Sequence, residues 1–215
     1  MNRKRWIMTV LSVSIVAFCG VSFSQETAIR EEWLKAFDSN DQERMTAIVK
    51  EKQEEVPAEI RSLVDEALLS ETTGEERVEL FYLAERMARS YMEVTGDAEL
   101  LKGVKQRIFE SKISPPVPTM RDKQAHVVEA IAQGEENYLF MPNNIVIKKG
   151  ETVRWVNSDT VDHLVGSVPF IGLGGIMTPL MKPGESLEYH FKEAGEYYYV
   201  CFIHKVMYGK VTVEE

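Results

Sequence analysis

Cysteine is scarce in this chain of 215 residues, which has only Cys19 and Cys201. Cys19 lies in an N-terminal stretch that we expect to be removed, which leaves one cysteine. A single cysteine cannot form an internal disulfide, and an exposed free thiol is a liability in an oxidising compartment. Cys201 should therefore be buried, paired with another chain or held by a metal.

The sequence also lacks an apolar run of the roughly 20 residues that a permanent membrane helix needs. The run from Ile7 to Val21 is shorter, is interrupted by hydroxyl residues and follows basic residues at 3–5. This pattern predicts a signal peptide over residues 1–24, export to the periplasm and no stable membrane span after cleavage. The alternatives are an uncleaved anchor and a lipoprotein attached through Cys19.

Basic residues are too few to favour a nucleic-acid partner. The 25 Lys and Arg residues against 34 Asp and Glu residues give a net charge of −9. Loss of the signal peptide, with its three basic residues, would make the net charge −12. Such acidity argues against nucleic acid and anionic lipid surfaces as partners.

Residues 25–113 contain neither histidine nor cysteine, and their apolar residues recur at helical spacing. We therefore predict an all-α helical bundle. The signals for helix ends are two capping boxes, one proline and one glycine, namely Ser39 with Gln42, Thr73 with Glu76, Pro57 and Gly96. This segment has 13 basic and 21 acidic residues, a net charge of −8. The absence of a phosphate-binding loop favours a role in docking or assembly.

A proline-rich linker is predicted at residues 114–124, because three prolines close together favour an extended spacer. Beyond it the hydrophobic period changes to two, which predicts a mainly antiparallel β-sandwich over residues 125–215. The seven expected strands are residues 126–131, 138–140, 145–147, 152–156, 187–191, 197–200 and 210–213. The predicted fold class is therefore α+β multidomain, a helical bundle followed by a β-sandwich.

Three metal-binding side chains lie between the last two of these strands. Cys201, His204 and Met207 follow one another at intervals of three residues. Soft sulfur and imidazole select copper, and a thiolate, two imidazoles and a weak axial methionine describe an electron-transfer copper site. The loop supplies three of these four groups, so the second imidazole must come from elsewhere.

The chain has four histidines, and three of them lie outside this loop. Strand alternation places His190 on an exposed face, and His126 beside the linker is likewise predicted at the surface. His163 differs, because it follows a polar turn at a strand end and precedes apolar residues. We predict His163 as the second imidazole. The alternative is a buried cysteine that lies beside a surface histidine and binds no metal.

From Tyr138 to its C-terminal end, the sequence resembles the cupredoxins, the type 1 blue-copper proteins. The short spacing from the cysteine to the methionine is most like that of the amicyanins, whereas plastocyanins and pseudoazurins have a longer gap. The matching stretches are Pro142, residues 149–157, His163, residues 195–197, the ligand loop and residues 209–214.

The resemblance implies a Greek-key β-sandwich with one type 1 copper. By resemblance His163, Cys201 and His204 are the strong ligands and Met207 the weak axial one. The copper would cycle between Cu(I) and Cu(II), and redox proteins would be the electron donor and acceptor.

The sequence departs from the cupredoxin pattern in two places. Cupredoxins often have an asparagine after the first histidine, linked to a hydroxyl residue after the cysteine. Here these residues are Leu164 and Phe202, so that link must be absent or replaced.

The leading functional hypothesis is an exported electron carrier whose helical domain docks partners. The alternative is a copper-binding or copper-delivery protein. An enzyme such as a multicopper oxidase or nitrite reductase is not expected, because it needs further copper centres that His126 and His190 do not make. The apolar, glycine-rich segment 166–177 is either a crossover that covers the core or a docking surface for a redox partner or the helical domain.

Overall fold

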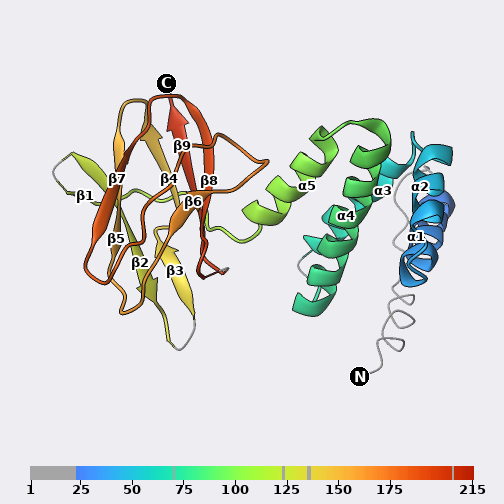
Figure 1. The fold of residues 1–215 in the computed structure, drawn as a ribbon, viewed down its shortest axis with the longest axis horizontal. Helices are drawn as coiled ribbons and strands as arrows, with labels where there is room; N and C mark the ends of the chain where they lie inside the picture. The colour runs from blue at the N-terminus through green and yellow to red at the C-terminus, as the bar shows by residue number, and fades with distance from the viewer. Residues whose placement is uncertain (1–22, 70, 123, 135–136, 205) are drawn as a thin grey trace.

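The computed structural model describes residues 23–69, 71–122, 124–134, 137–204 and 206–215. Residues 1–22 of the predicted signal peptide lie outside these ranges. Five helices precede the sheets (Figure 1): α1 (Phe23–Asp38), α2 (Gln42–Glu51), α3 (Val56–Ala67), α4 (Gly74–Thr95) and α5 (Glu99–Glu110). None of the helices in the described ranges is long and apolar enough to cross a bilayer.

The helix ends follow the sequence signals except at α2. Thr73 and Glu76 form the predicted capping box, Pro57 lies in the first turn of α3, and Gly96 ends α4 with a φ of 77°. The predicted box at Ser39 was wrong. The Ser39 hydroxyl donates to carbonyls in the last turn of α1, while the carboxylate of Asp41 accepts the backbone N–H of Arg44 and caps α2.

Two sheets pack face to face to form the β-sandwich. The strands are β1 (Arg121–Asp122), β2 (Ala125–Ala132), β3 (Tyr138–Met141), β4 (Asn144–Lys148), β5 (Thr152–Asn157), β6 (Val165–Ser167), β7 (Ser186–His190), β8 (Gly195–Cys201) and β9 (Tyr208–Glu214). One sheet has the order β1-β2-β5-β7 with β3 also paired to β2, and the other has the order β4-β9-β8-β6. All seven predicted strands are present, and the short strands β1 and β6 are additional.

The sandwich is mainly antiparallel, as predicted, and it also contains two parallel pairs that the sequence did not indicate. Strands β2 and β5 pair in parallel, as do β4 and β9, while the other recorded strand pairs are antiparallel. Turn signals in a sequence report hairpins between successive strands, whereas both parallel pairs join strands that are distant in the chain. The Greek-key order stays a prediction. The core between the sheets is built on large side chains that include Trp155, Tyr199, Phe140 and Phe191.

The prediction that His126 lies at the surface was wrong. His126 is only 6% exposed, because the preceding chain folds back as β1 and places Arg121 opposite it. Its ring lies 2.5 Å from the hydroxyl of Thr119 and 3.0 Å from the carboxylate of Glu151. His190 is exposed, as predicted.

Helix α5 joins the helices to the outer face of the β4-β9-β8-β6 sheet. Phe109 is buried in T-shaped contact with two tyrosine rings, with centroid distances of 5.3 Å to Tyr198 and 5.2 Å to Tyr208. The same cluster includes Ile171, so segment 166–177 covers part of this contact. Other residues of that segment, Phe170 and Met177, are exposed.

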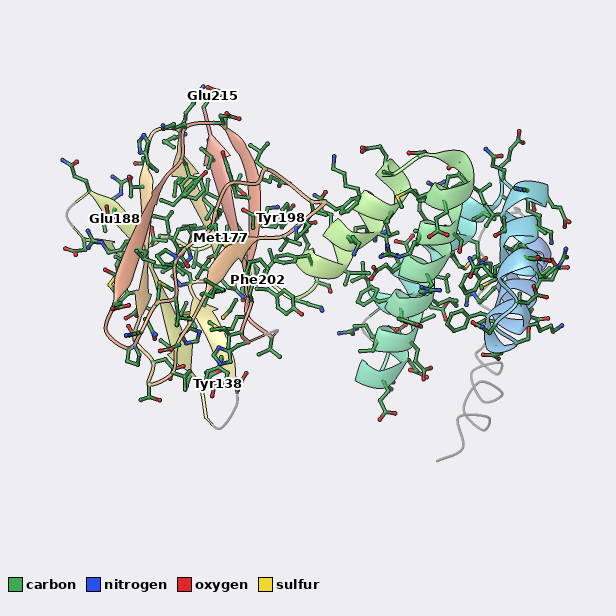
Figure 2. All side chains as sticks on the ribbon, viewed as in Figure 1. Tyr138, Met177, Glu188, Tyr198, Phe202 and Glu215 are labelled. Atoms are coloured by element: carbon green, nitrogen blue, oxygen red, sulfur yellow. The ribbon has the colours of Figure 1, made fainter. Side chains whose placement is uncertain are left out.

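A polar network surrounds the aromatic contact. The Tyr198 hydroxyl lies 2.6 Å from the carboxylate of Glu110 and 2.8 Å from that of Glu196 (Tyr198 is labelled in Figure 2). The ammonium of Lys210 pairs with both carboxylates, at 2.9 and 2.6 Å. Burial and the two carboxylates raise the pKa of Tyr198 far above its usual value, so the phenol stays protonated.

The predicted linker is held against the sandwich. The backbone N–H groups of Ser114 and Val117 donate to the Asn143 side chain and the Asn144 carbonyl, each at 3.1 Å. The Asn144 amide donates back to the Ser114 carbonyl at 2.8 Å. The segment is thus tied to the start of β4, and β1 begins within it. The domain boundaries at residues 113 and 125 stay a prediction.

The position of Phe109 yields a stability prediction. Replacing Phe109 by Ala should lower the free energy of unfolding by about 3–5 kcal/mol, because it leaves a cavity between α5 and the two tyrosines. Urea unfolding followed by circular dichroism measures this change. Val117→Ala, at a position that is 45% exposed, is the control and should change little. Equal losses for the two variants would contradict the contact.

Candidate metal centre

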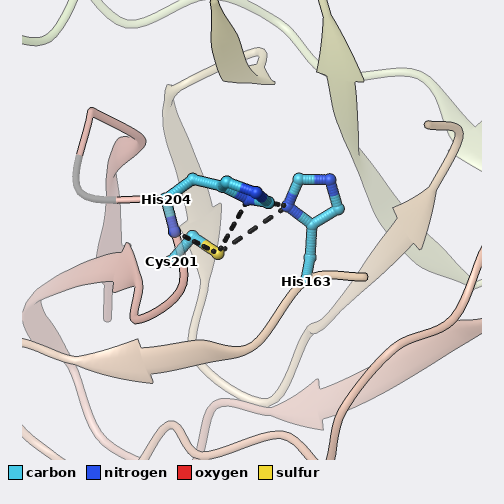
Figure 3. Close-up of side chains that lie close together, drawn as sticks. All are labelled: His163, Cys201 and His204. Atoms are coloured by element: carbon cyan, nitrogen blue, oxygen red, sulfur yellow. Dashed lines mark hydrogen bonds between the residues drawn. The ribbon is translucent and has the colours of Figure 1, made fainter. Parts of the chain in front are cut away.

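Three side chains from two separate segments of the chain converge at one end of the sandwich (Figure 3). His163 Nδ1 and His204 Nδ1 lie 3.2 Å apart, and each lies 3.7 Å from Cys201 Sγ. Within the described ranges, this is the only cluster of three or more His, Cys, Asp or Glu donors placed to hold a metal ion. His126 and His190 lie outside it.

Cys201 ends β8, and the loop that follows it folds back on itself. The backbone N–H of Met207 donates to the His204 carbonyl at 3.1 Å, and that of Cys201 donates to the Met207 carbonyl at 3.3 Å. The His204 N–H points to Cys201 Sγ at 3.4 Å. The three-residue spacing therefore closes into a tight turn that directs both the thiol and the imidazole inward.

The turn that follows β5 positions His163. The buried side-chain amide of Asn157 donates to the carbonyls of Val161 and Met181, at 2.8 and 2.9 Å. The backbone of His163 exchanges two hydrogen bonds with Met181, at 2.9 and 2.8 Å. These contacts fix the backbone of His163, whose side chain is fully buried.

A backbone link joins the two segments that carry the donors. Strand β6 pairs antiparallel with β8, so that Val165 lies opposite Cys201. The N–H of Phe202 donates to the Leu164 carbonyl at 2.9 Å. The two positions at which cupredoxins often have a side-chain link are thus joined here by a main-chain hydrogen bond.

Asp159 is a site residue that the sequence interpretation missed. Its carboxylate is buried and lies 3.3 Å from His163 Nε2, on the side of the ring away from Cys201. Metal-binding histidines commonly give their second ring N–H to a carboxylate, which fixes the ring and makes it a stronger donor. An acidic residue four positions before the histidine was the available signal, although such spacing is common in sequences.

A second missed residue is Tyr138, at the start of β3. Its ring stacks on the imidazole of His204 with a centroid distance of 4.1 Å and an interplanar angle of 29°. A tyrosine in a strand carries no sequence signal for this contact, because β3 and the ligand loop are far apart in the chain.

The electrostatics of the cluster favour a thiolate. Burial opposes ionisation of Cys201, but the hydrogen bond with His163 and backbone N–H groups outweigh it and lower the pKa of the thiol to about 6. Burial alone would lower the pKa of His163, whereas its contacts with Cys201 and Asp159 raise it overall. A thiolate and an imidazole therefore face each other near neutral pH, and a metal cation would displace the imidazole proton.

The donor geometry fits a small, soft metal ion. Metal–nitrogen and metal–sulfur bonds of about 2.0–2.3 Å that diverge by about 100–120° separate their donor atoms by about 3.1–4.0 Å. The observed separations of 3.2 and 3.7 Å fall in this range. The chemistry of one thiolate and two imidazoles suits copper.

Met207, the fourth predicted ligand, lies in the same turn with a fully buried side chain that joins the sandwich core. The structure thus brings His163, Cys201 and His204 together and places Met207 beside them in the loop. The assignment of all four as metal ligands stays a prediction.

Comparisons with known proteins agree on the β half of the chain. The family model described as copper binding proteins, plastocyanin/azurin family, matches residues 126–214. Amicyanin from Paracoccus versutus is 34% identical over 87 residues, which cover 40% of this chain and 66% of that protein. Plastocyanin from Scenedesmus fuscus is 35% identical over 85 residues, which cover 35% of this chain and 87% of that protein.

Among solved structures, a purple cupredoxin from Nitrosopumilus maritimus is 29% identical to this chain, with a TM-score of 0.37. The match covers 41% of this chain and 98% of the purple cupredoxin. This chain spans slightly less than two thirds of the P. versutus amicyanin. The family binds one copper, and the donor cluster lies within the matched region. Through residues 126–214, this chain belongs to the plastocyanin/azurin family of copper-binding proteins.

Proposed function

We propose that this protein is an electron carrier with one type 1 copper, held by His163, Cys201 and His204, with Met207 as a weak axial ligand. The observation that carries the proposal is the convergence of a low-pKa thiol and two imidazoles at separations of 3.2–3.7 Å. Copper supplies a one-electron step between Cu(II) and Cu(I). The protein contributes a fixed arrangement of donors that serves both oxidation states.

The buried side of the site sets the donor arrangement. His163 is oriented by Asp159, and Cys201 is held by the β6–β8 pairing, so neither side chain needs to move when the charge at the site changes. A rigid donor set favours fast electron transfer, because little rearrangement accompanies it. The apolar core around Cys201 favours the less charged, reduced state.

The exposed side of the site is where we place electron entry and exit. His204 is half-buried, and the neighbouring loop residues Phe202, Ile203 and Val206 expose 43%, 45% and 57% of their surfaces. Exposed apolar side chains next to a redox centre suit brief contact with another protein. Protein redox partners are therefore proposed as donor and acceptor, and substrate conversion is not.

Copper delivery is the second candidate, and it uses the same ligands. The orientation of the donors by buried groups favours electron transfer, because a carrier that hands over its metal needs ligands that open.

Export to the periplasm is part of the proposal. It is supported by the signal-like N-terminal sequence and by the single buried cysteine of the region after it. We assign residues 25–113 to a helical domain and 125–215 to the copper domain, joined by residues 114–124.

We assign partner docking to the helical segment. Residues 25–113 carry a net charge of −8, and Glu54, Glu55, Glu75 and Glu79 are exposed. Helix α5 packs on the outer face of a sheet, and the other helices lie on the far side of α5 from the sandwich and do not cover the ligand loop (Figure 1). A basic partner could be steered by the helices while electrons pass at the loop.

The electron-carrier proposal predicts the spectrum of the copper protein. One equivalent of Cu(II) should give an intense blue thiolate-to-copper band that ascorbate bleaches reversibly. Cys201→Ser should abolish the band, whereas Met177→Leu, at an exposed methionine outside the ligand set, should leave it unchanged. Absorption and electron spin resonance measure the outcome. A Cu(II) form without the blue band would favour copper delivery instead.

The contact between Asp159 and His163 predicts a shift in reduction potential. Asp159→Asn removes a negative charge that stabilises Cu(II), so the potential should rise by on the order of 60 mV, a tenfold change for a one-electron couple. Asp162→Asn is the control, because it removes the same charge from the residue next to His163. Protein-film voltammetry measures both, and equal shifts would refute a specific role for the Asp159 contact.

The docking assignment predicts salt-dependent electron exchange. Changing Glu54, Glu55, Glu75 and Glu79 together to Gln should slow exchange with a basic c-type cytochrome about tenfold at low ionic strength, and less at high salt. Exchange with a small neutral metal complex and the copper spectrum should not change. Stopped-flow absorption measures the rates. Docking by the helices would be refuted if the cytochrome rate did not respond.

A further inference from the structure

The two imidazoles of the metal centre lie in different surroundings. His163 is fully buried and has the carboxylate of Asp159 behind its ring. His204 is half-buried on a loop whose neighbouring side chains are exposed. Among the described residues, the hydrogen bonds recorded for the His204 ring are those between its Nδ1 and the other two donors. Within the described part of the chain, the outer nitrogen of His204 thus has no recorded carboxylate partner like Asp159.

The contact that His204 has in place of a carboxylate is an aromatic ring. Tyr138 stacks on its imidazole at 4.1 Å and 29°, whereas the same tyrosine meets His163 edge-on at 6.0 Å and 72°. Aromatic pairs prefer offset stacked or edge-to-face arrangements at such separations. Tyr138 therefore covers one face of the half-buried imidazole of His204 and only touches the buried imidazole of His163.

Strand β3 gives this tyrosine a fixed position. Tyr138 pairs with Ala132 of β2, and its half-buried side chain packs against the sandwich core. Figure 2 shows Tyr138 at the end of the sandwich opposite the C-terminal Glu215. The ring is thus held by a different sheet from the one that carries the ligand loop.

We propose that Tyr138 is a positioning residue for His204, a role that rests on the proposed assignment of His204 as a copper ligand. The stack limits rotation of the imidazole about its side-chain bonds, which a short exposed loop does not restrict by itself. One imidazole is oriented by a carboxylate and the other by an aromatic face. Loss of the stack should let His204 leave the metal more often and accelerate copper release.

The first test is made on the wild-type protein without metal. The aromatic ring current should move the His204 ring-proton resonances upfield, with nuclear Overhauser contacts to Tyr138, while those of His163 move much less. Tyr138→Phe should keep the upfield position, and Tyr138→Leu should lose it. Unshifted His204 resonances in the wild type would overturn the stack, and this result does not depend on any variant folding.

The second test measures copper release. With a large excess of a Cu(I) chelator, Tyr138→Leu should release copper between about twofold and tenfold faster than the wild type, the range expected for one aromatic pair. Tyr138→Phe should match the wild type. Equal release by Tyr138→Leu and the wild type would overturn the positioning role even if the stack is present.

A third observation separates this proposal from the proposed function. Loading the wild type with Cu(I) should shift the His204 resonances if His204 is a ligand. If they do not shift, the ligand assignment fails, and the positioning role fails with it. If they shift but Tyr138→Leu releases copper at the wild-type rate, the ligand assignment stands and only the role of Tyr138 is lost.

Discussion

The metal centre depends on the pairing of β6 with β8. This pairing places Val165 opposite Cys201 and lets the Phe202 N–H reach the Leu164 carbonyl, which brings the His163 segment against the cysteine. Because strand side chains alternate between faces, a slip of one residue would turn the thiol away from the imidazole. The register of the main chain therefore specifies the site, and side-chain contacts such as that of Asp159 with His163 refine it.

The two imidazoles differ in their exposure to solvent. The His163 side is buried, as are Asp159 and Asn157, so His163 can bind a metal away from the surface. The His204 side opens to solvent among apolar side chains, where a partner can approach. A copper between them would be insulated on one side and accessible on the other, so electrons would pass at the loop end of the sandwich.

Much of this molecule could be predicted from local sequence. The capping box at Thr73, the helix end at Gly96 and all seven expected strands follow short-range patterns, and the spacing in the Cys201 loop is equally local. What escaped prediction is non-local. The parallel pairs β2–β5 and β4–β9, the burial of His126 beneath β1, and the contacts of Asp159 and Tyr138 depend on segments that meet only in the folded chain.

Helix α5 connects the helical segment to the sheet that carries the ligand loop. Phe109 rests on Tyr198, three residues before Cys201, and on Tyr208, which directly follows Met207. The aromatic contact therefore touches both strands that enter and leave the loop, while the loop stays uncovered. Because α5 is anchored on these strands, a partner bound to the acidic surface of the helices would be connected to the loop through this contact. Attachment and electron transfer can thus use separate surfaces of the chain.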